Sequence, residues 1–169
     1  MEDIQKQIGK KIEIAANVGI VIVAILAVTV WITNSRKQAA EPGRIAVGTK
    51  FAINDVNWRG NGKTMVLALA TTCHFCTESA GFYRELVQYC NSHNIPTVAV
   101  FPQTADEGRS YLTNEGVKVN DVRQASFSTI QVSGTPTLLL IDENGAVKRV
   151  WVGKLSPDEE KRVLSQLGS

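Results

Sequence analysis

The sequence predicts an α/β domain, with a central mixed sheet flanked by helices, preceded by one transmembrane helix. Three observations favour this arrangement. An uncharged, apolar segment occupies residues 14–32. Two apolar, β-rich segments at 65–70 and 96–101 enclose a segment with helical spacing, which is the pattern of a βαβ unit. Two further β-rich segments, 137–141 and 147–152, flank an Asn-Gly pair that is typical of a hairpin turn.

The apolar segment 14–32 is long enough to cross a lipid bilayer. As a helix it would reach about 28 Å, close to the thickness of a hydrocarbon core, and Trp31 lies where an interfacial aromatic residue is expected. A cleaved signal peptide is less consistent, since the segment is long for one and no small-x-small site follows closely. A buried soluble helix is also less consistent, because such helices are rarely apolar on every face. We expect an N-terminal tail at 1–13, a retained anchor at 14–32, a linker at 33–47 and a folded domain at 48–169.

The first half of the folded domain is predicted to form a strand, a helix and a strand. Residues 65–70 are a continuous apolar run, as expected of a strand that is covered on both faces. Residues 74–89 have helical spacing, with Phe82 and Leu86 on one side. The run 96–101 is the second buried strand. Two parallel strands joined by a helix imply a right-handed crossover.

The second half is predicted to add two helices and the hairpin. Thr104 and Glu107 have the spacing of a capping box at a helix start, and Gly116 suits the end of that helix. The Asn-Gly turn makes the last two strands antiparallel. A second capping box at 156–159, with a proline in the first turn, opens a C-terminal helix. The resulting order, β-α-β-α-β-β-α, is that of the thioredoxin fold.

Cys73 and Cys76 form a C-x-x-C pair at the junction between the first strand and the first helix. A cysteine at a helix start lies beside unpaired backbone N–H groups and the positive end of the helix dipole. That environment favours the thiolate, which is the nucleophile in disulfide exchange. The second cysteine, one turn further on, can attack the mixed disulfide and release the partner. We therefore expect Cys73 to attack and Cys76 to resolve.

The two residues between the cysteines are expected to tune the active site. A protonated His74 would add positive charge beside the thiolate and stabilise it. The alternative for His74 is a solvated helix-end residue with little influence. Phe75 is expected to shield the cysteine pair or to form part of a docking surface.

Metal and haem sites are less consistent with this cysteine pattern. A structural zinc site needs four ligands, commonly in two spaced pairs. Only Cys90 and His93 could add to the pair, and along a continuous helix they would lie about 21 Å from Cys76. Haem attachment requires C-x-x-C-H, whereas Thr77 follows Cys76. Cys90 is predicted to be a buried core residue.

The segment 48–167 resembles the TlpA/ResA-like branch of the thioredoxin superfamily, which are membrane-tethered thiol–disulfide oxidoreductases of bacteria. The resemblance rests on four features, which are Val47-Gly48 with Phe51, Cys73-x-x-Cys76, Gly134-Thr135-Pro136-Thr137, and Ile141-Asp142-Glu143-Asn144-Gly145 followed by Gly153. It implies that Pro136 is cis and lies against the cysteines, and that the Thr135 backbone pairs with an extended partner segment. An ordinary trans turn proline is the alternative.

The sequence departs from this family at several positions around the cysteine pair. Thr72 replaces the usual tryptophan before the first cysteine, and Gly81 replaces the usual helix proline. Ser79 stands where many members have glutamate, while Glu78 is one place earlier and so about 100° further round a helix. The buried aspartate of thioredoxin aligns with Leu67. No acceptor for the Cys76 proton is therefore assigned.

The resemblance implies that the Cys73–Cys76 dithiol reduces disulfides of extracytoplasmic proteins, such as apocytochromes c. The expected partners are protein disulfides and thiols, a transmembrane electron donor and the lipid bilayer, with no cofactor. The expected location is the inner membrane of a bacterium, with the catalytic domain on the periplasmic side. With 18 basic and 16 acidic residues and no basic stripe, the chain is not expected to bind nucleic acid.

The alternative function is a copper-handling or redox-inert interaction module on the same fold. Cys73, Cys76 and His74 would then be the copper ligands, and metal titration set against a disulfide-exchange assay separates the two. A peroxiredoxin-like peroxidase is less consistent, because its P-x-x-x-T-x-x-C motif is absent before either cysteine of the pair.

Overall fold

The computed structural model describes residues 24, 28–29, 45–53 and 56–168. The chain divides into two units, Met1–Glu41 and Pro42–Ser169, and the second unit contains the sheet. The predicted tail and nearly all of the predicted anchor and linker lie outside the described residues. Within the residues that are described, no helix is long and apolar enough to span a membrane.

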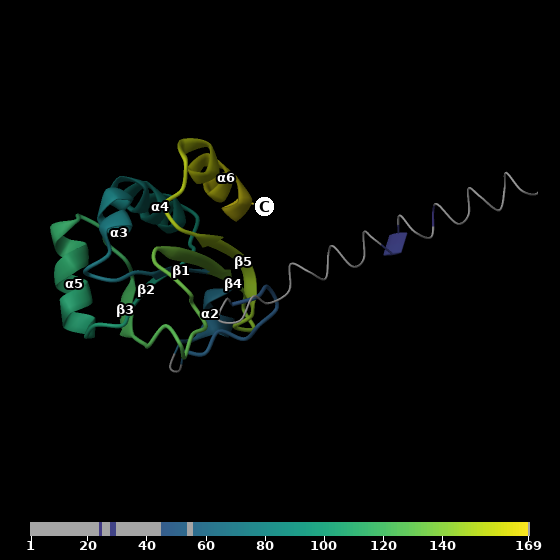
Figure 1. Ribbon diagram of the computed structural model, residues 1–169, viewed down its shortest axis with the longest axis horizontal. Coiled ribbons are helices and arrows are strands. Elements are labelled where there is room, and N and C mark those ends of the chain that lie inside the picture. Colours follow the sequence, from purple (N-terminus) through teal and green to yellow (C-terminus); the bar gives the residue numbers. More distant parts are fainter. Residues whose placement is uncertain (1–23, 25–27, 30–44, 54–55, 169) are drawn as a thin grey trace, which may run out of the picture. The chain divides into compact units, whose positions relative to one another are not determined.

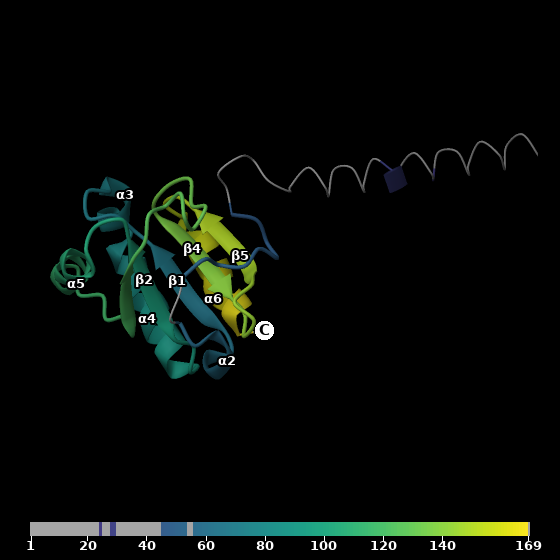
Figure 2. The ribbon, with the colours of Figure 1, turned by 90° about the horizontal axis from the view of Figure 1, so that it is seen from below.

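Five strands form one mixed sheet in the order β3-β2-β1-β4-β5 (Figures 1 and 2). β1 pairs in parallel with β2, β2 pairs in parallel with β3, and the pairs β1–β4 and β4–β5 are antiparallel. The strands are β1 (Thr64–Ala68), β2 (Thr97–Phe101), β3 (Asp121–Gln124), β4 (Thr137–Ile141) and β5 (Val147–Val152). The predicted βαβ unit and hairpin are confirmed.

Helices and irregular segments cover the two faces of this sheet. The helices are α2 (Trp58–Asn61), α3 (His74–Glu78), α4 (Ala80–Ser92), α5 (Ala105–Asn114) and α6 (Pro157–Leu167). In Figure 1, α4 and α6 lie above the sheet and α2 lies below it. The thioredoxin fold expected from the sequence, a mixed sheet flanked by helices, is confirmed for this unit.

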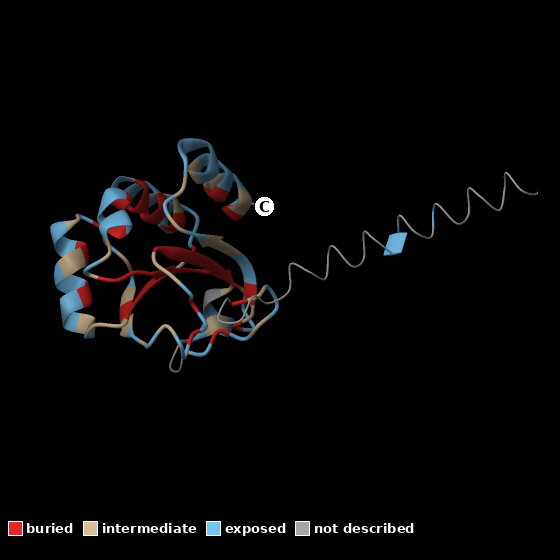
Figure 3. Cartoon of the chain, in the orientation of Figure 1, coloured by how far each residue is buried: buried red, intermediate tan, exposed pale blue. Residues whose placement is uncertain are grey.

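The sheet separates two apolar clusters, because alternate side chains of a strand point to opposite faces. Leu67 and Leu69 face the cluster that includes buried residues of α4, α5 and α6. Val66 and Ala68 face the second cluster, which includes Phe51 and Ile130 from irregular segments. Figure 3 shows the buried residues concentrated on the strands and on the inner faces of the helices. β1 is therefore covered on both faces, as its continuous apolar run predicts.

The local signals that start and end the helices match the structure. Thr104 and Glu107 make a reciprocal capping box at the start of α5, and Ser156 and Glu159 make another at the start of α6. Gly116 follows the end of α5 with φ +69°, a conformation that favours glycine.

The structure corrects two details of the predicted order. The helix expected over 74–89 is interrupted at Ser79, so that α3 and α4 are separate helices. β3 was not predicted, because its four residues are only partly buried at the sheet edge and lack a continuous apolar run. The order of the sheet strands and their helices is therefore β-α-α-β-α-β-β-β-α.

The packing of α5 on β2 generates a stability prediction at Gly108. A Cβ atom on Gly108 would lie 2.6 Å from Cδ2 of Phe101, whose side chain is fully buried. Gly108→Ala is therefore expected to lower the free energy of unfolding by about 1–3 kcal/mol through overpacking. Gly81→Ala is the matched control, because its Cβ would meet nothing nearer than 3.8 Å. Urea unfolding midpoints test this, and equal midpoints for the two variants would contradict the close packing.

Candidate active site

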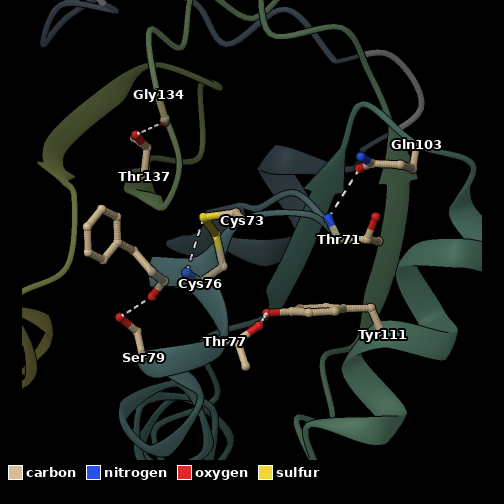
Figure 4. The surroundings of a disulfide bond; sticks show 10 residues. Thr71, Cys73, Cys76, Thr77, Ser79, Gln103, Tyr111, Gly134 and Thr137 are labelled. Carbon is tan, nitrogen blue, oxygen red and sulfur yellow. Dashed lines mark hydrogen bonds between the residues drawn. A yellow bond between two sulfur atoms is a disulfide. The ribbon is translucent and has the colours of Figure 1, made fainter.

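Three loops meet at the edge of the sheet where β1 ends. β1 and β2 are parallel, so the loops that follow them, 69–73 and 102–104, leave from the same edge. β4 is antiparallel to β1, and Thr137 at its start pairs with Ala68 at the end of β1. The loop 133–136 therefore arrives at that edge too. Figure 4 shows this loop on one side of the cysteine pair and the loop after β2 on the other.

Cys73 and Cys76 form a disulfide at this edge, with their Cα atoms 5.2 Å apart. Cys73 is the N-cap of α3 and is half-buried, whereas Cys76 lies within the helix and is fully buried. A partner molecule approaching from solvent therefore meets the Cys73 sulphur first. The structure places both predicted cysteines where the sequence expects them.

The backbone of α3 contacts the Cys73 sulphur directly. The Cys76 amide donates a hydrogen bond to Cys73 Sγ over 3.1 Å (Figure 4). A hydrogen bond to a charged acceptor is stronger than one to a neutral acceptor, so this amide favours the thiolate form of Cys73 once the disulfide is reduced. The N-cap position of Cys73 thus gives the outer cysteine a built-in donor.

His74 and Phe75 both lie on the exposed side of α3. The His74 side chain is 78% exposed, and its Nε2 lies 3.1 Å from Oε1 of Glu78. Its ring is tilted against the Phe75 ring, with 5.8 Å between the centroids. Phe75 is a large apolar residue with 54% of its surface exposed to solvent. A shielding or docking role for Phe75 and a tuning role for His74 stay predictions.

The peptide bond between Thr135 and Pro136 is cis, as the family resemblance implies. Pro136 is buried and Thr135 is half-buried. The Gly153 amide donates to the Pro136 carbonyl over 2.7 Å, which ties this loop to the end of β5. The Thr137 hydroxyl donates to the Gly134 carbonyl over 2.7 Å, which closes the loop on itself. Thr135 and Pro136 therefore belong to the same edge of the sheet as the cysteines.

Other contacts at this edge join residues that no local motif connects. The Gln103 side chain accepts a hydrogen bond from the Thr71 amide over 3.4 Å, and the hydroxyls of Thr77 and Tyr111 lie 3.3 Å apart. Lys154, in the loop after β5, donates to the Glu78 carboxylate over 2.9 Å. Sequence motifs could not find these residues. Of these residues, only Gln103 could have been expected at this edge, because it follows β2, which is parallel to β1 and ends at the same edge of the sheet.

The surroundings of Cys76 are apolar. It shares a buried cluster with Leu67 and Tyr83, and no described aspartate or glutamate is buried. Ser79 stands where a glutamate is common in the family; it is buried and donates to the Phe75 carbonyl over 2.8 Å. Burial raises the pKa of the Tyr83 hydroxyl, so the phenol is neutral at physiological pH. A buried carboxylate is therefore not the acceptor of the Cys76 proton among the described residues.

Cys90 is buried and free, as expected of a core cysteine. Burial raises the pKa of its thiol to about 12, so it stays protonated and unreactive at neutral pH. No group of three or more His, Cys, Asp or Glu side chains that could hold a metal ion occurs among the described residues.

Comparisons with known proteins agree on the fold. A family model described as a thioredoxin-like domain matches residues 51–168. Similar solved structures include one described as the thiol:disulfide interchange protein DsbE of Chlorobium tepidum, with 18% identity, a TM-score of 0.58, and coverage of 73% of this chain and 96% of that chain. The thioredoxin domain of a thiol-disulfide oxidoreductase of Bacteroides vulgatus is also similar, with 12% identity, a TM-score of 0.57, and coverage of 74% of this chain and 99% of that chain.

A thiol-disulfide isomerase of Corynebacterium glutamicum is also similar, with 13% identity, a TM-score of 0.53, and coverage of 73% of this chain and 93% of that chain. At these identities the likeness extends to the fold alone. No curated protein matches this chain in sequence.

The geometry predicts an order of reactivity for the three thiols after reduction. Cys73 is expected to be alkylated at a pH below about 8.5, the pKa of a free cysteine, because its thiolate accepts a hydrogen bond from the Cys76 amide. Cys76 is expected to react more slowly, and Cys90 only on unfolding. Alkylation with a small reagent across pH, followed by peptide mass spectrometry, measures this order. Equal titration of Cys73 and Cys76 would contradict it.

Proposed function

The chain belongs to the thioredoxin-like domain family, and we propose that this thiol–disulfide oxidoreductase is tethered to a membrane and reduces disulfides of extracytoplasmic proteins, such as apocytochromes c. One observation supports the exchange chemistry. Cys73 is half-buried, its sulphur accepts a hydrogen bond from the Cys76 amide, and it forms a disulfide with the buried Cys76. The direction, the substrates and the membrane tether are supported by the family resemblance and by the apolar segment 14–32.

Reduction proceeds in two thiol–disulfide exchanges. The Cys73 thiolate attacks one sulphur of the partner's disulfide, so that a mixed disulfide forms and the partner's other sulphur leaves as a thiolate. Cys76 then loses its proton and attacks the Cys73 sulphur. The partner's second sulphur leaves as a thiolate, and both partner thiolates take up protons from solvent. Two electrons have passed to the partner, and the pair ends as the Cys73–Cys76 disulfide.

A further turnover needs two electrons from a dithiol donor. For a domain on the extracytoplasmic side, we propose that a transmembrane protein supplies them through the same pair of cysteines. Each exchange then runs in reverse, with the donor's thiolate attacking the Cys73–Cys76 disulfide.

The Thr135 main chain is proposed to hold the partner in an extended form. Among the described residues, its amide and carbonyl have no hydrogen-bonding partner, and they lie at the edge of the sheet from which Cys73 is presented. An extended segment that adds to such a backbone gains main-chain hydrogen bonds that do not depend on its sequence. This mode of binding suits an enzyme that must accept several different disulfides.

The proposed location can be tested in spheroplasts. After mild reduction of intact spheroplasts, a membrane-impermeant thiol reagent is expected to label Cys73 before any lysis. A Cys73→Ser variant controls for other thiols and is expected to stay unlabelled, because Cys76 and Cys90 are buried. Labelling that appears only after lysis would place the domain on the cytoplasmic side.

The proposed order of attack can be tested by trapping in the native cell. Cys76→Ser is expected to accumulate mixed disulfides with extracytoplasmic proteins, because Cys73 still attacks and nothing resolves the product. Cys73→Ser is the matched control and is expected to trap at most a few per cent as much. The idea fails if the two variants trap alike, or if the partners of Cys76→Ser are all cytoplasmic.

A further inference from the structure

Glu78 joins the cysteine helix to the loop that follows β5. One carboxylate oxygen, Oε1, lies 3.1 Å from Nε2 of His74, and the other, Oε2, accepts a hydrogen bond from Nζ of Lys154 over 2.9 Å. The Lys154 ammonium lowers the pKa of Glu78, so the carboxylate is ionised at neutral pH. A single anion therefore lies between two groups that can each carry positive charge.

This contact directs the His74 side chain along the helix. Cys73 precedes α3, whereas Glu78 is four residues after His74 and is the last residue of α3. An imidazole that bonds to the residue four places later is turned toward the end of the helix. The His74 imidazole is thus directed along α3 toward Glu78, and its ring is tilted against that of Phe75 with 5.8 Å between the centroids.

Lys154 connects this bridge to the proline loop. It follows Gly153, whose amide donates to the Pro136 carbonyl. The Lys154 charge also acts on Glu160 of α6, which in turn lies within electrostatic range of Glu85 of α4. Among the described residues, the titratable groups that contact Glu78 are therefore His74 on its own helix and Lys154 in the loop after β5, and Glu160 of α6 lies within electrostatic range of Lys154.

We propose that Glu78 is a positioning residue that keeps the Cys73–Cys76 pair reducing, by drawing the His74 imidazole away from the Cys73 sulphur and by opposing negative charge there. This inference rests on the proposed exchange reaction and deepens it. A reductant requires a dithiol that is readily oxidised, and a dithiol is readily oxidised when its thiolate is not strongly stabilised. A histidine free to approach Cys73 would stabilise the thiolate and make the pair more oxidising.

Replacing Glu78 and replacing its partner Lys154 should move the Cys73 alkylation midpoint and the redox equilibrium in opposite directions, which tests the proposal. Glu78→Gln removes the anion and releases His74, so the pH midpoint for Cys73 alkylation is expected to fall by about 0.3–0.7 units, as expected of exposed charge pairs. The equilibrium constant with glutathione is expected to shift toward the dithiol by the same two- to fivefold factor. Lys154→Met leaves the carboxylate uncompensated, and both quantities are expected to move in the opposite direction.

Two controls separate positioning from a general effect of charge or folding. Glu143→Gln removes an exposed carboxylate at the hairpin between β4 and β5, at the opposite edge of the sheet, and is expected to change neither quantity. His74→Ala combined with Glu78→Gln is expected to show a smaller shift than Glu78→Gln alone, because the imidazole is then absent and only the loss of the carboxylate charge remains.

The proposal is overturned if Glu78→Gln and Lys154→Met shift the equilibrium in the same direction, or if Glu78→Gln moves it no more than Glu143→Gln. A shift by Glu78→Gln that persists fully in the His74→Ala background also overturns it. All variants are measured as purified full-length protein in detergent with glutathione as the only partner. The outcome therefore does not depend on which protein is the substrate, or on which side of a membrane the domain lies.

Discussion

The hydrogen bond from the Cys76 amide to the Cys73 sulphur depends on where β1 ends and α3 begins. β1 is buried on both faces, so its position is fixed by two apolar clusters rather than by the loop that follows it. The chain leaves β1 through a short loop, and Cys73 caps the next helix. The donor that favours the thiolate is therefore part of the backbone, and substitution of a neighbouring side chain does not remove it.

The mixed sheet supplies the remainder of the site. Because β2 is parallel and β4 antiparallel to β1, the loop after β2 and the loop before β4 reach the same edge as Cys73. One loop provides Gln103 and the other provides Thr135 and Pro136. The cysteine pair, the loop with the cis Thr135–Pro136 bond and the Glu78–Lys154 ion pair are thus brought together from segments that are far apart in the sequence.

The features that local sequence determines could be predicted, and the contacts between distant segments could not. The buried strands, both capping boxes, the Asn-Gly hairpin and the role of the helix start at Cys73 each follow from a few adjacent residues. The break at Ser79 and the edge strand β3 lacked such a signal. Lys154 lies 76 residues from Glu78, and only the folded chain shows that the two side chains meet. The predicted membrane anchor lies almost wholly outside the described residues and stays a prediction.

Cys73 is proposed to attack and Cys76 to resolve in a two-electron exchange. A single-turnover reaction of the reduced protein with a small peptide disulfide, followed by intact-mass spectrometry, tests it most directly. The wild-type chain is expected to pass through a transient peptide adduct on Cys73 and to end two hydrogens lighter, with two peptide thiols released. An adduct that forms first on Cys76, or one that never resolves in the wild-type chain, would contradict the account.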